Sequence, residues 1–332
     1  MARQLRIQVP GAFYLVSNQT ETKTNLFRDS EEKAIFMECL LETRSKTGWQ
    51  IHAYALVKDG YYILLECPEP NLVDGMKWFQ GAFTAKVNKH RGKREPLFVR
   101  RYRSVIIDPG ESEIFGKIAD YIHTAPIWSK SHKGSPSEYE WSSCSGYLAA
   151  KSKRDSWLTA DKVLAGLGLK DDTGGRKKYG QHIADRASAL GGSSIPSELA
   201  TEWKPITRGW YIGGDKFLKD IRGVIDKTRQ GKVPGKASPK NVHGETMARN
   251  IIKAGFKILK IKESDLAKMP LGSDEKVILA YTLRSLTTVS QDWISKRLKM
   301  GHRTNVSNGI TRVKNDQDGN LLKLVRQIEK AL

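Results

Sequence analysis

The segment from Lys86 to Arg103 has the composition of a surface that contacts a nucleic-acid backbone. It holds eight lysines and arginines against a single acid, Glu95. A second segment, from Arg229 to Lys262, holds nine against Glu245. Neither has the strongly apolar face of a membrane-surface helix, so this clustering favours contacts with phosphates. In the first segment we expect those contacts from Lys86, Lys89, Arg91, Arg100, Arg101, Tyr102 and Arg103.

The whole chain has the same bias towards positive charge. Its 332 residues include 56 Lys and Arg against 36 Asp and Glu, a formal net charge of +20. This excess attracts polyanions; the alternative is a generally basic protein without such a partner. No apolar run reaches the roughly 18 residues of a membrane span, and the first residues do not read as a signal peptide. We therefore expect a cytoplasmic, nucleoid-associated protein with no membrane contact.

A third group of polar side chains lies near the C-terminus. The pattern predicts a helix at about 275–286, a second helix capped by Ser290, a Met300–Gly301 turn and a third helix at about 303–314. Two helices joined by a glycine-containing turn are typical of a helix-turn-helix, whose second helix reads base edges with arginine and short polar side chains. A plain three-helix bundle with a polar outer face is the alternative. The candidate contacts are Arg303, Thr304, Asn305, Asn308 and Arg312.

The elements around the first basic segment alternate over the first 125 residues. Strand-like and helix-like patterns follow one another in the order β-α-β-β-α-β-α, with an Asp59–Gly60 turn between the second and third strands. That order contains the split β-α-β unit of ferredoxin-like folds. It predicts an α+β domain with an antiparallel sheet and helices on one face.

These patterns divide the chain into three parts. Residues 1–150 form the ferredoxin-like domain and residues 241–332 the helical domain that binds DNA. Between them, 151–240 is an irregular and helical connector that ends in a basic flexible linker, "GKVPGKASPK". Three cysteines, odd in number and far apart, fit neither a disulfide framework nor a zinc site.

Several motifs, in order and at similar spacing, resemble those of the single-tyrosine HUH transposases, specifically the REP-associated tyrosine transposase group. The N-terminal half contains "GAFYLVSNQTE", "HAYALVKDGYYILLECPEPNL", "LFVRRYRSVIID" and "YIHTAPIWSK", followed by "WSSCSGYLA". Later, "ITRGWYIGGDKFLKDI" and "WISKRLKMGHRTNVSN" are similar to an extension found in a longer-tailed subset. The resemblance covers most of the chain, least so at 160–205. It implies an HUH-type domain.

The resemblance also implies a catalytic site that differs in this chain. In the family, two histidines of an H-x-H motif hold magnesium or manganese, which polarises the scissile phosphate, while a tyrosine forms a 5′-phosphotyrosine intermediate. The tyrosine matches Tyr121, a candidate nucleophile that is vestigial if the metal is required. The H-x-H positions are Gly60 and Tyr62, and neither supplies an imidazole. We expect no bound metal or other cofactor, with Tyr62 filling the former metal pocket.

Three functions follow as hypotheses. The first is a domesticated transposase that binds hairpin and duplex DNA without metal-dependent nicking, with Tyr61, Tyr62 and Tyr102 available to stack unpaired bases. The second is an active transposase that uses Tyr121 in DNA transposition. The third is a scaffold or regulator that acts with a protein partner and is organised by nucleic acid, including RNA.

Overall fold

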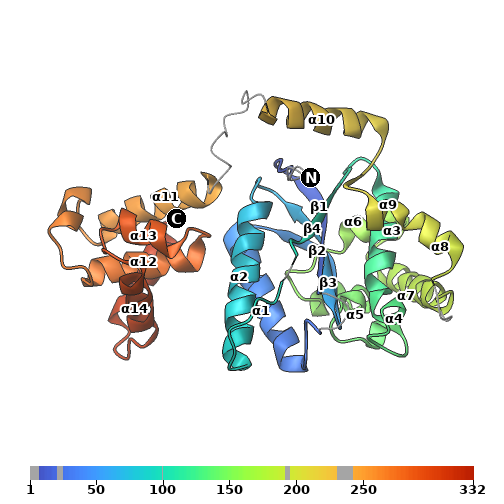
Figure 1. The fold of residues 1–332 in the computed structure, drawn as a ribbon, viewed down its shortest axis with the longest axis horizontal. Coiled ribbons are helices and arrows are strands. Elements are labelled where there is room, and N and C mark those ends of the chain that lie inside the picture. Colours follow the sequence, from blue (N-terminus) through green and yellow to red (C-terminus); the bar gives the residue numbers. More distant parts are fainter. Residues whose placement is uncertain (1–6, 21–24, 99, 191–194, 230–241) are drawn as a thin grey trace. The chain divides into compact units, whose positions relative to one another are not determined.

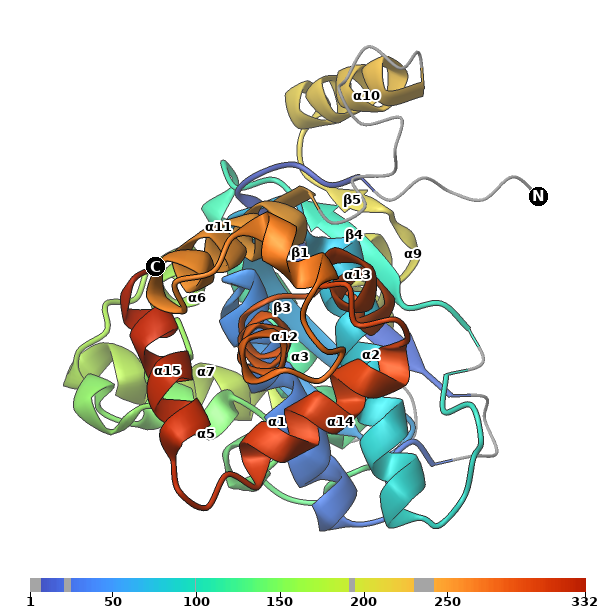
Figure 2. The same ribbon diagram turned by 90° about the vertical axis from the view of Figure 1, so that its left-hand side faces the viewer.

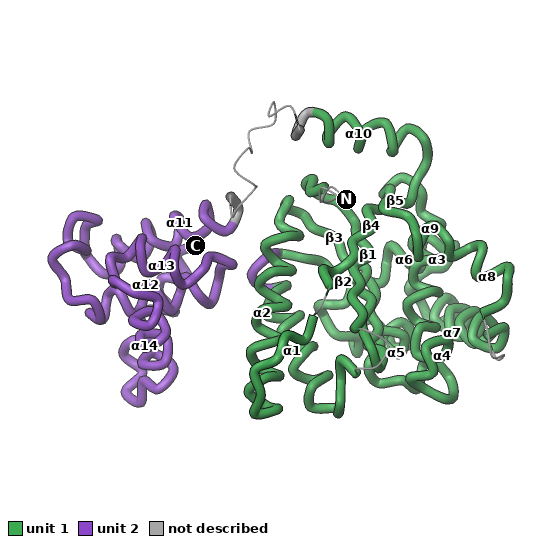
Figure 3. The backbone as a smooth tube through the Cα atoms, in the orientation of Figure 1, with its two compact units in different colours: residues 1–44, 48–236 green, residues 45–47, 237–332 purple. Residues whose placement is uncertain are grey.

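The computed structural model describes residues 7–20, 25–98, 100–190, 195–229 and 242–332. Contacts divide the chain into two compact units, residues 1–44 with 48–236, and residues 45–47 with 237–332 (Figure 3). The first unit therefore includes most of the expected connector. The expected basic linker, 231–240, lies outside the described residues.

The first unit is built on a five-stranded sheet in the order β2-β3-β1-β4-β5. Its strands are β1 (Ala12–Gln19), β2 (Gln50–Val57), β3 (Gly60–Cys67), β4 (Arg103–Ile107) and β5 (Tyr211–Ile212). The first four pair antiparallel, and β5 adds to β4 in parallel. The predicted element order is present, and the fold is α+β.

One face of this sheet is covered by α1 (Ser30–Thr47) and α2 (Leu72–His90), which lie side by side (Figure 1). The side chain of Asp29 caps α1 by accepting from the backbone N–H of Glu32 at 2.8 Å. Gly48 ends the helix with φ of 72°, a conformation that glycine adopts without steric cost. Phe36, Phe79 and Phe83 pack together over the strands.

Helices also cover the opposite face, so the expectation of helices on one face was wrong. That layer contains α3 (Ser112–His123), α4 (Ala125–Trp128), α5 (Cys144–Leu148), α6 (Asp161–Gly166), α7 (Thr173–Ser188), α8 (Ser197–Glu202) and α9 (Lys204–Arg208) (Figure 1). The reason is that both faces of β1 are apolar: Phe13 and Leu15 point to this layer, and Tyr14 and Val16 to the other. A sheet that is apolar on both faces needs two covering layers.

The stretch from 151 to 208, expected as a connector, contributes directly to this second layer. Leu158, Val163, Tyr179, Trp203 and Ile206 are all buried in its core. Beyond β5 the unit continues into α10 (Asp215–Arg229). The boundary expected at residue 150 therefore falls inside one packed unit.

The C-terminal unit contains α11 (Val242–Ile258), α12 (Asp274–Leu286), α13 (Gln291–Arg297), α14 (Arg303–Lys314) and α15 (Asn320–Lys330). In Figure 2, α12 is seen nearly end on and α14 runs across it. Ser290 caps α13 by accepting from the backbone N–H of Trp293. The α13–α14 turn places Lys299 and Gly301 at positive φ. The three helices predicted here are present at nearly the predicted bounds. No helix among the described residues is long and apolar enough to span a membrane.

Candidate nucleic-acid interface

Three side chains form a row across the sheet at the ends of its central strands. Ser17 on β1 is paired with Tyr62 on β3 and with Arg103 on β4. Residues directly opposite one another in neighbouring strands point to the same face. This face is the one covered by α3, where Tyr121 lies.

Tyr62 and Tyr121 meet at one end of this row. Their rings stand edge to face with centroids 5.3 Å apart, and the ring of Trp128 contacts both. The amide Nε2 of Gln19 donates to the Tyr62 hydroxyl at 2.6 Å. Burial raises the pKa of both tyrosines, although hydrogen bonding to Tyr62 and the charge of Arg103 oppose the rise at Tyr121. Both side chains are neutral phenols at physiological pH.

At the other end of the row, Arg103 is a half-buried cation. Its guanidinium donates to the carbonyl oxygens of Ile206 and Gly209, which close the turn between α9 and β5. Burial lowers its pKa, because a charge loses hydration there. No carboxylate pairs with it in the part of the chain that the structure describes. The positive charge of Arg103 is therefore not neutralised by a described carboxylate.

A cavity of about 610 Å³ opens beside this row. Its walls carry four aromatic rings, three cations and several hydroxyl or amide groups. The lining residues are Leu15, Ser17, Gln19, Tyr62, Arg103, Tyr121, Trp128, Ile195, Ala200, Thr201, Trp203, Lys204, Thr207 and Arg208. Among these described residues none has a carboxylate, an imidazole or a thiol, the usual protein ligands of divalent metals. The residues beside Tyr121 therefore do not fit the magnesium or manganese of the resembled family.

Gly60, the other position that matches the H-x-H motif, leaves no room for a side chain. A Cβ added to it would lie 2.4 Å from the carbonyl oxygen of Asn18 and 2.9 Å from Cγ of Gln19. The first of these atoms belongs to the backbone of the paired strand β1. A histidine therefore cannot be restored here without moving that strand.

No family model matches the chain, and no curated protein matches it in sequence. One solved structure is similar: a REP-associated tyrosine transposase bound to a REP hairpin. The similarity covers 49% of this chain and 93% of that chain, at 13% sequence identity and a TM-score of 0.39. It is a distant likeness in the arrangement of helices and strands, and no residue role is transferred from it.

A second cavity, of about 330 Å³, shares Arg103 and Arg208 with the first. Arg101 also lines it, together with Ser104 and Trp210. Arg101 and Arg208 are exposed. The two cavities together place three arginines around the start of β4.

Several residues expected to bind nucleic acid have other roles. Arg91 forms a buried ion pair: its Nε and Nη2 donate to the two carboxylate oxygens of Glu32 at 2.6 and 2.7 Å. Lys86 pairs with Glu38 at 2.8 Å. Tyr61 is fully buried, so it presents no face to a base, whereas Tyr102 is 6% exposed and lines the second cavity. The expectations for Arg91 and Tyr61 were therefore wrong, while Lys89, Arg100 and Arg101 are exposed.

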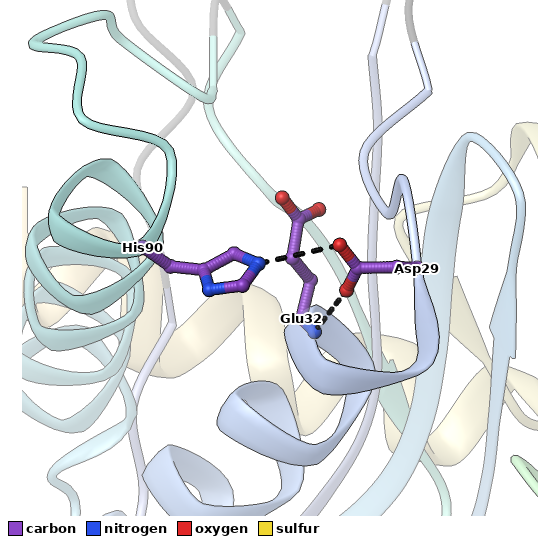
Figure 4. A group of neighbouring side chains, drawn as sticks. All are labelled: Asp29, Glu32 and His90. Carbon is purple, nitrogen blue, oxygen red and sulfur yellow. Dashed lines mark hydrogen bonds and ion pairs between the residues drawn. The ribbon is translucent and has the colours of Figure 1, made fainter.

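The neighbouring cluster of Asp29, Glu32 and His90 has the residue types of a metal site (Figure 4). It lies on the α1 and α2 side of the sheet, the face opposite Tyr121. Asp29 is occupied as the cap of α1, and both oxygens of Glu32 accept from Arg91. His90 pairs with Asp29 at 3.3 Å. Its contacts are those of a helix cap joined to ion pairs.

The candidate contacts on α14 divide into two groups. Arg303, Thr304 and Asn308 are exposed on the helix surface. Asn305 donates to the carbonyl of Met300, and Arg312 pairs with Asp274 at 2.5 Å. The side chains of Arg303, Thr304 and Asn308 are therefore accessible to a partner. Those of Asn305 and Arg312 make contacts within the C-terminal unit.

Sequence reasoning missed the residues that close the main cavity from α8 and α9, namely Trp203, Lys204 and Arg208. They lie at the edge of the stretch that least resembles the family. One signal was available: "EWKPITRGW" places two tryptophans and two cations within nine residues.

Proposed function

We propose that this protein binds structured single-stranded DNA, a hairpin with an unpaired flank, without nicking it. The observation that carries the proposal is the lining of the cavity beside Tyr121. Four aromatic rings and three cations line it, and no described lining residue is an acid, a histidine or a cysteine. Such a surface offers stacking to bases and charge to phosphates, which are the two means by which proteins hold single strands.

The same lining argues against cleavage. A tyrosine that attacks a phosphate must lose its proton, and the buried phenol of Tyr121 has a raised pKa. Tyr62, which packs against it, is itself a neutral phenol that accepts a hydrogen bond from Gln19. No described residue in the cavity is a general base or a metal ligand. Tyr121 therefore serves as a wall of the binding site.

The C-terminal unit would bind a duplex stem through α14. Arg303 and Thr304 are exposed at the start of this helix, the position from which a recognition helix contacts base edges, and Asn308 is exposed in its middle. Two binding units on one chain increase each other's effective concentration. Truncation after residue 240 should therefore weaken binding strongly, and unchanged affinity of the truncated chain would refute the two-unit proposal.

The test exposes the full chain to a randomised stem-loop DNA pool with magnesium and manganese. Half of the sample is washed under native conditions and half with hot detergent, and the retained DNA is sequenced. We expect enrichment only after the native wash. Strands that survive detergent in the wild type but not in Tyr121→Phe would establish an active transposase instead. Enrichment only from a matched RNA pool would favour the scaffold hypothesis.

A further inference from the structure

The charge, aromatic lining and size of the cavity beside Tyr121 indicate which part of a DNA strand it holds. We infer that it receives one unpaired nucleotide of a DNA strand, with the base against Trp128 and the phosphate on Arg103, Lys204 and Arg208. This inference rests on the proposed function and assigns the ligand of one subsite within it.

The first argument is charge. Arg103 is half-buried, and its two hydrogen bonds go to neutral carbonyl groups. Lys204 and Arg208 line the same cavity, are exposed, and have no ion pair within the described residues. Removing a cation from water without a carboxylate beside it is costly unless an anion joins it, and this applies to Arg103. Together with the two exposed cations at the same opening, Arg103 fits a phosphate.

The second argument is the aromatic wall. Tyr121 packs between Trp128, at 5.2 Å between ring centroids, and Trp203, at 5.1 Å. Trp128 is the partly exposed member of this cluster, so it has surface to offer a base. Trp203 is 1% exposed and packs against Tyr121, so Trp128 is the ring that a base can contact.

The third argument is size and access. The cavity volume of about 610 Å³ falls within the roughly 300–1,000 Å³ of small-ligand sites. A base inside a duplex cannot enter such a cavity unless it leaves the stack, so the occupant is unpaired. The adjoining cavity, with Arg101 and the shared Arg103 and Arg208, continues the positive surface for the next phosphate.

The experiment uses the full chain and a fluorescein-labelled DNA hairpin with thymidine flanks on both sides. In a series of such hairpins, one flank nucleotide at a time is made abasic, and each affinity is measured by anisotropy. We expect one position to lose about tenfold in affinity, the effect of removing one stacked base, while the others change little. If the intact hairpin bound but every abasic position lowered affinity equally, or no position lowered it, the subsite would be wrong. The proposed function would not be affected by that result.

Protein variants connect the sensitive position to this cavity. In Trp128→Ala, the intact hairpin and the hairpin abasic at that position should bind equally. In Lys204→Met/Arg208→Met, affinity for the intact hairpin should fall, while Lys177→Met/Lys178→Met, which removes two exposed cations from α7, should not change it. A preserved tenfold difference in Trp128→Ala would place the base elsewhere. No binding of any DNA hairpin, or binding of only the RNA version, would refute the proposed function itself and this subsite with it.

Discussion

The ring of Tyr62 meets the ring of Tyr121 edge to face, with centroids 5.3 Å apart and planes at 86°. In the resembled family these two positions would be a metal ligand and the nucleophile it serves. Here they are packing partners whose pKa values burial raises. Both rings thereby form part of the wall of the cavity.

A histidine cannot be placed at position 60 by substitution of Gly60 alone. We expect Gly60→Ala to lower the free energy of unfolding by about 1–3 kcal/mol, because the added Cβ overpacks a fixed backbone and would lie 2.4 Å from the Asn18 carbonyl. Gly81→Ala is the matched control, since its Cβ meets nothing within 4 Å on α2, and it should stabilise by about 0.5–1 kcal/mol. Denaturant unfolding measures both. A neutral Gly60→Ala would mean that β1 moves easily and that a histidine could be accommodated.

The ion pair of Arg91 and Glu32 should govern stability rather than binding. Arg91→Met leaves a buried carboxylate without its partner, which costs about 3–5 kcal/mol. Lys89→Met, an exposed change on the same helix, should stay within about 0.5 kcal/mol. Burial would raise the pKa of Glu32, but the hydrogen bonds from Arg91 and from the backbone N–H of Arg28 lower it overall. The contribution of the pair is therefore present above about pH 4.3 and is lost as pH falls through the lower folded pKa. If Arg91→Met kept full stability but bound DNA more weakly, the prediction would be wrong and Arg91 would belong to the DNA interface.

His182 on α7 should make stability decrease as pH rises. Its Nε2 contacts the buried carboxylate of Asp120 at 2.8 Å, and this hydrogen bond raises the pKa of the imidazole, while burial and Arg186 oppose the rise. The folded state thus holds the proton more tightly than the unfolded chain. The stabilisation is fully present below about pH 6.5 and disappears as pH rises through the folded pKa. The stability difference between wild type and His182→Gln should shrink from acid to alkaline pH, and a difference independent of pH would contradict the assignment.

Local elements were predictable because their signals are local. Ser290 is followed by an amphipathic run and does cap α13, and Gly48 ends α1 with a positive φ as glycine at that place predicts. The order of strands and helices over the first 125 residues was predicted from the patterns of these segments. None of these inferences needs a contact between distant parts of the chain.

Side-chain roles were less predictable because they depend on partners far away in sequence. Arg91 is paired with Glu32, 59 residues earlier, so a residue that seemed to add to a basic patch is neutralised. Tyr102 and Arg103 are neighbours in sequence, yet only Arg103 lines the cavity beside Tyr121, because alternate strand residues point to opposite faces. Trp203 and Lys204 come from the stretch that was expected to connect two domains.

The division of α14 into exposed and engaged residues leads to the last prediction. Arg303→Ala and Asn308→Ala, each in the full chain, should lower affinity for the hairpin sequence enriched in the selection by about 1–3 kcal/mol and relax the base preference of the stem. Arg326→Ala removes an exposed arginine from α15 and serves as the charge-matched control. If Arg303 contacts a phosphate rather than a base, its removal should weaken all sequences alike and reduce the salt dependence by about one counterion. If affinity and base preference stayed unchanged in both variants, α14 would not be part of the interface, and the N-terminal unit would bind the DNA.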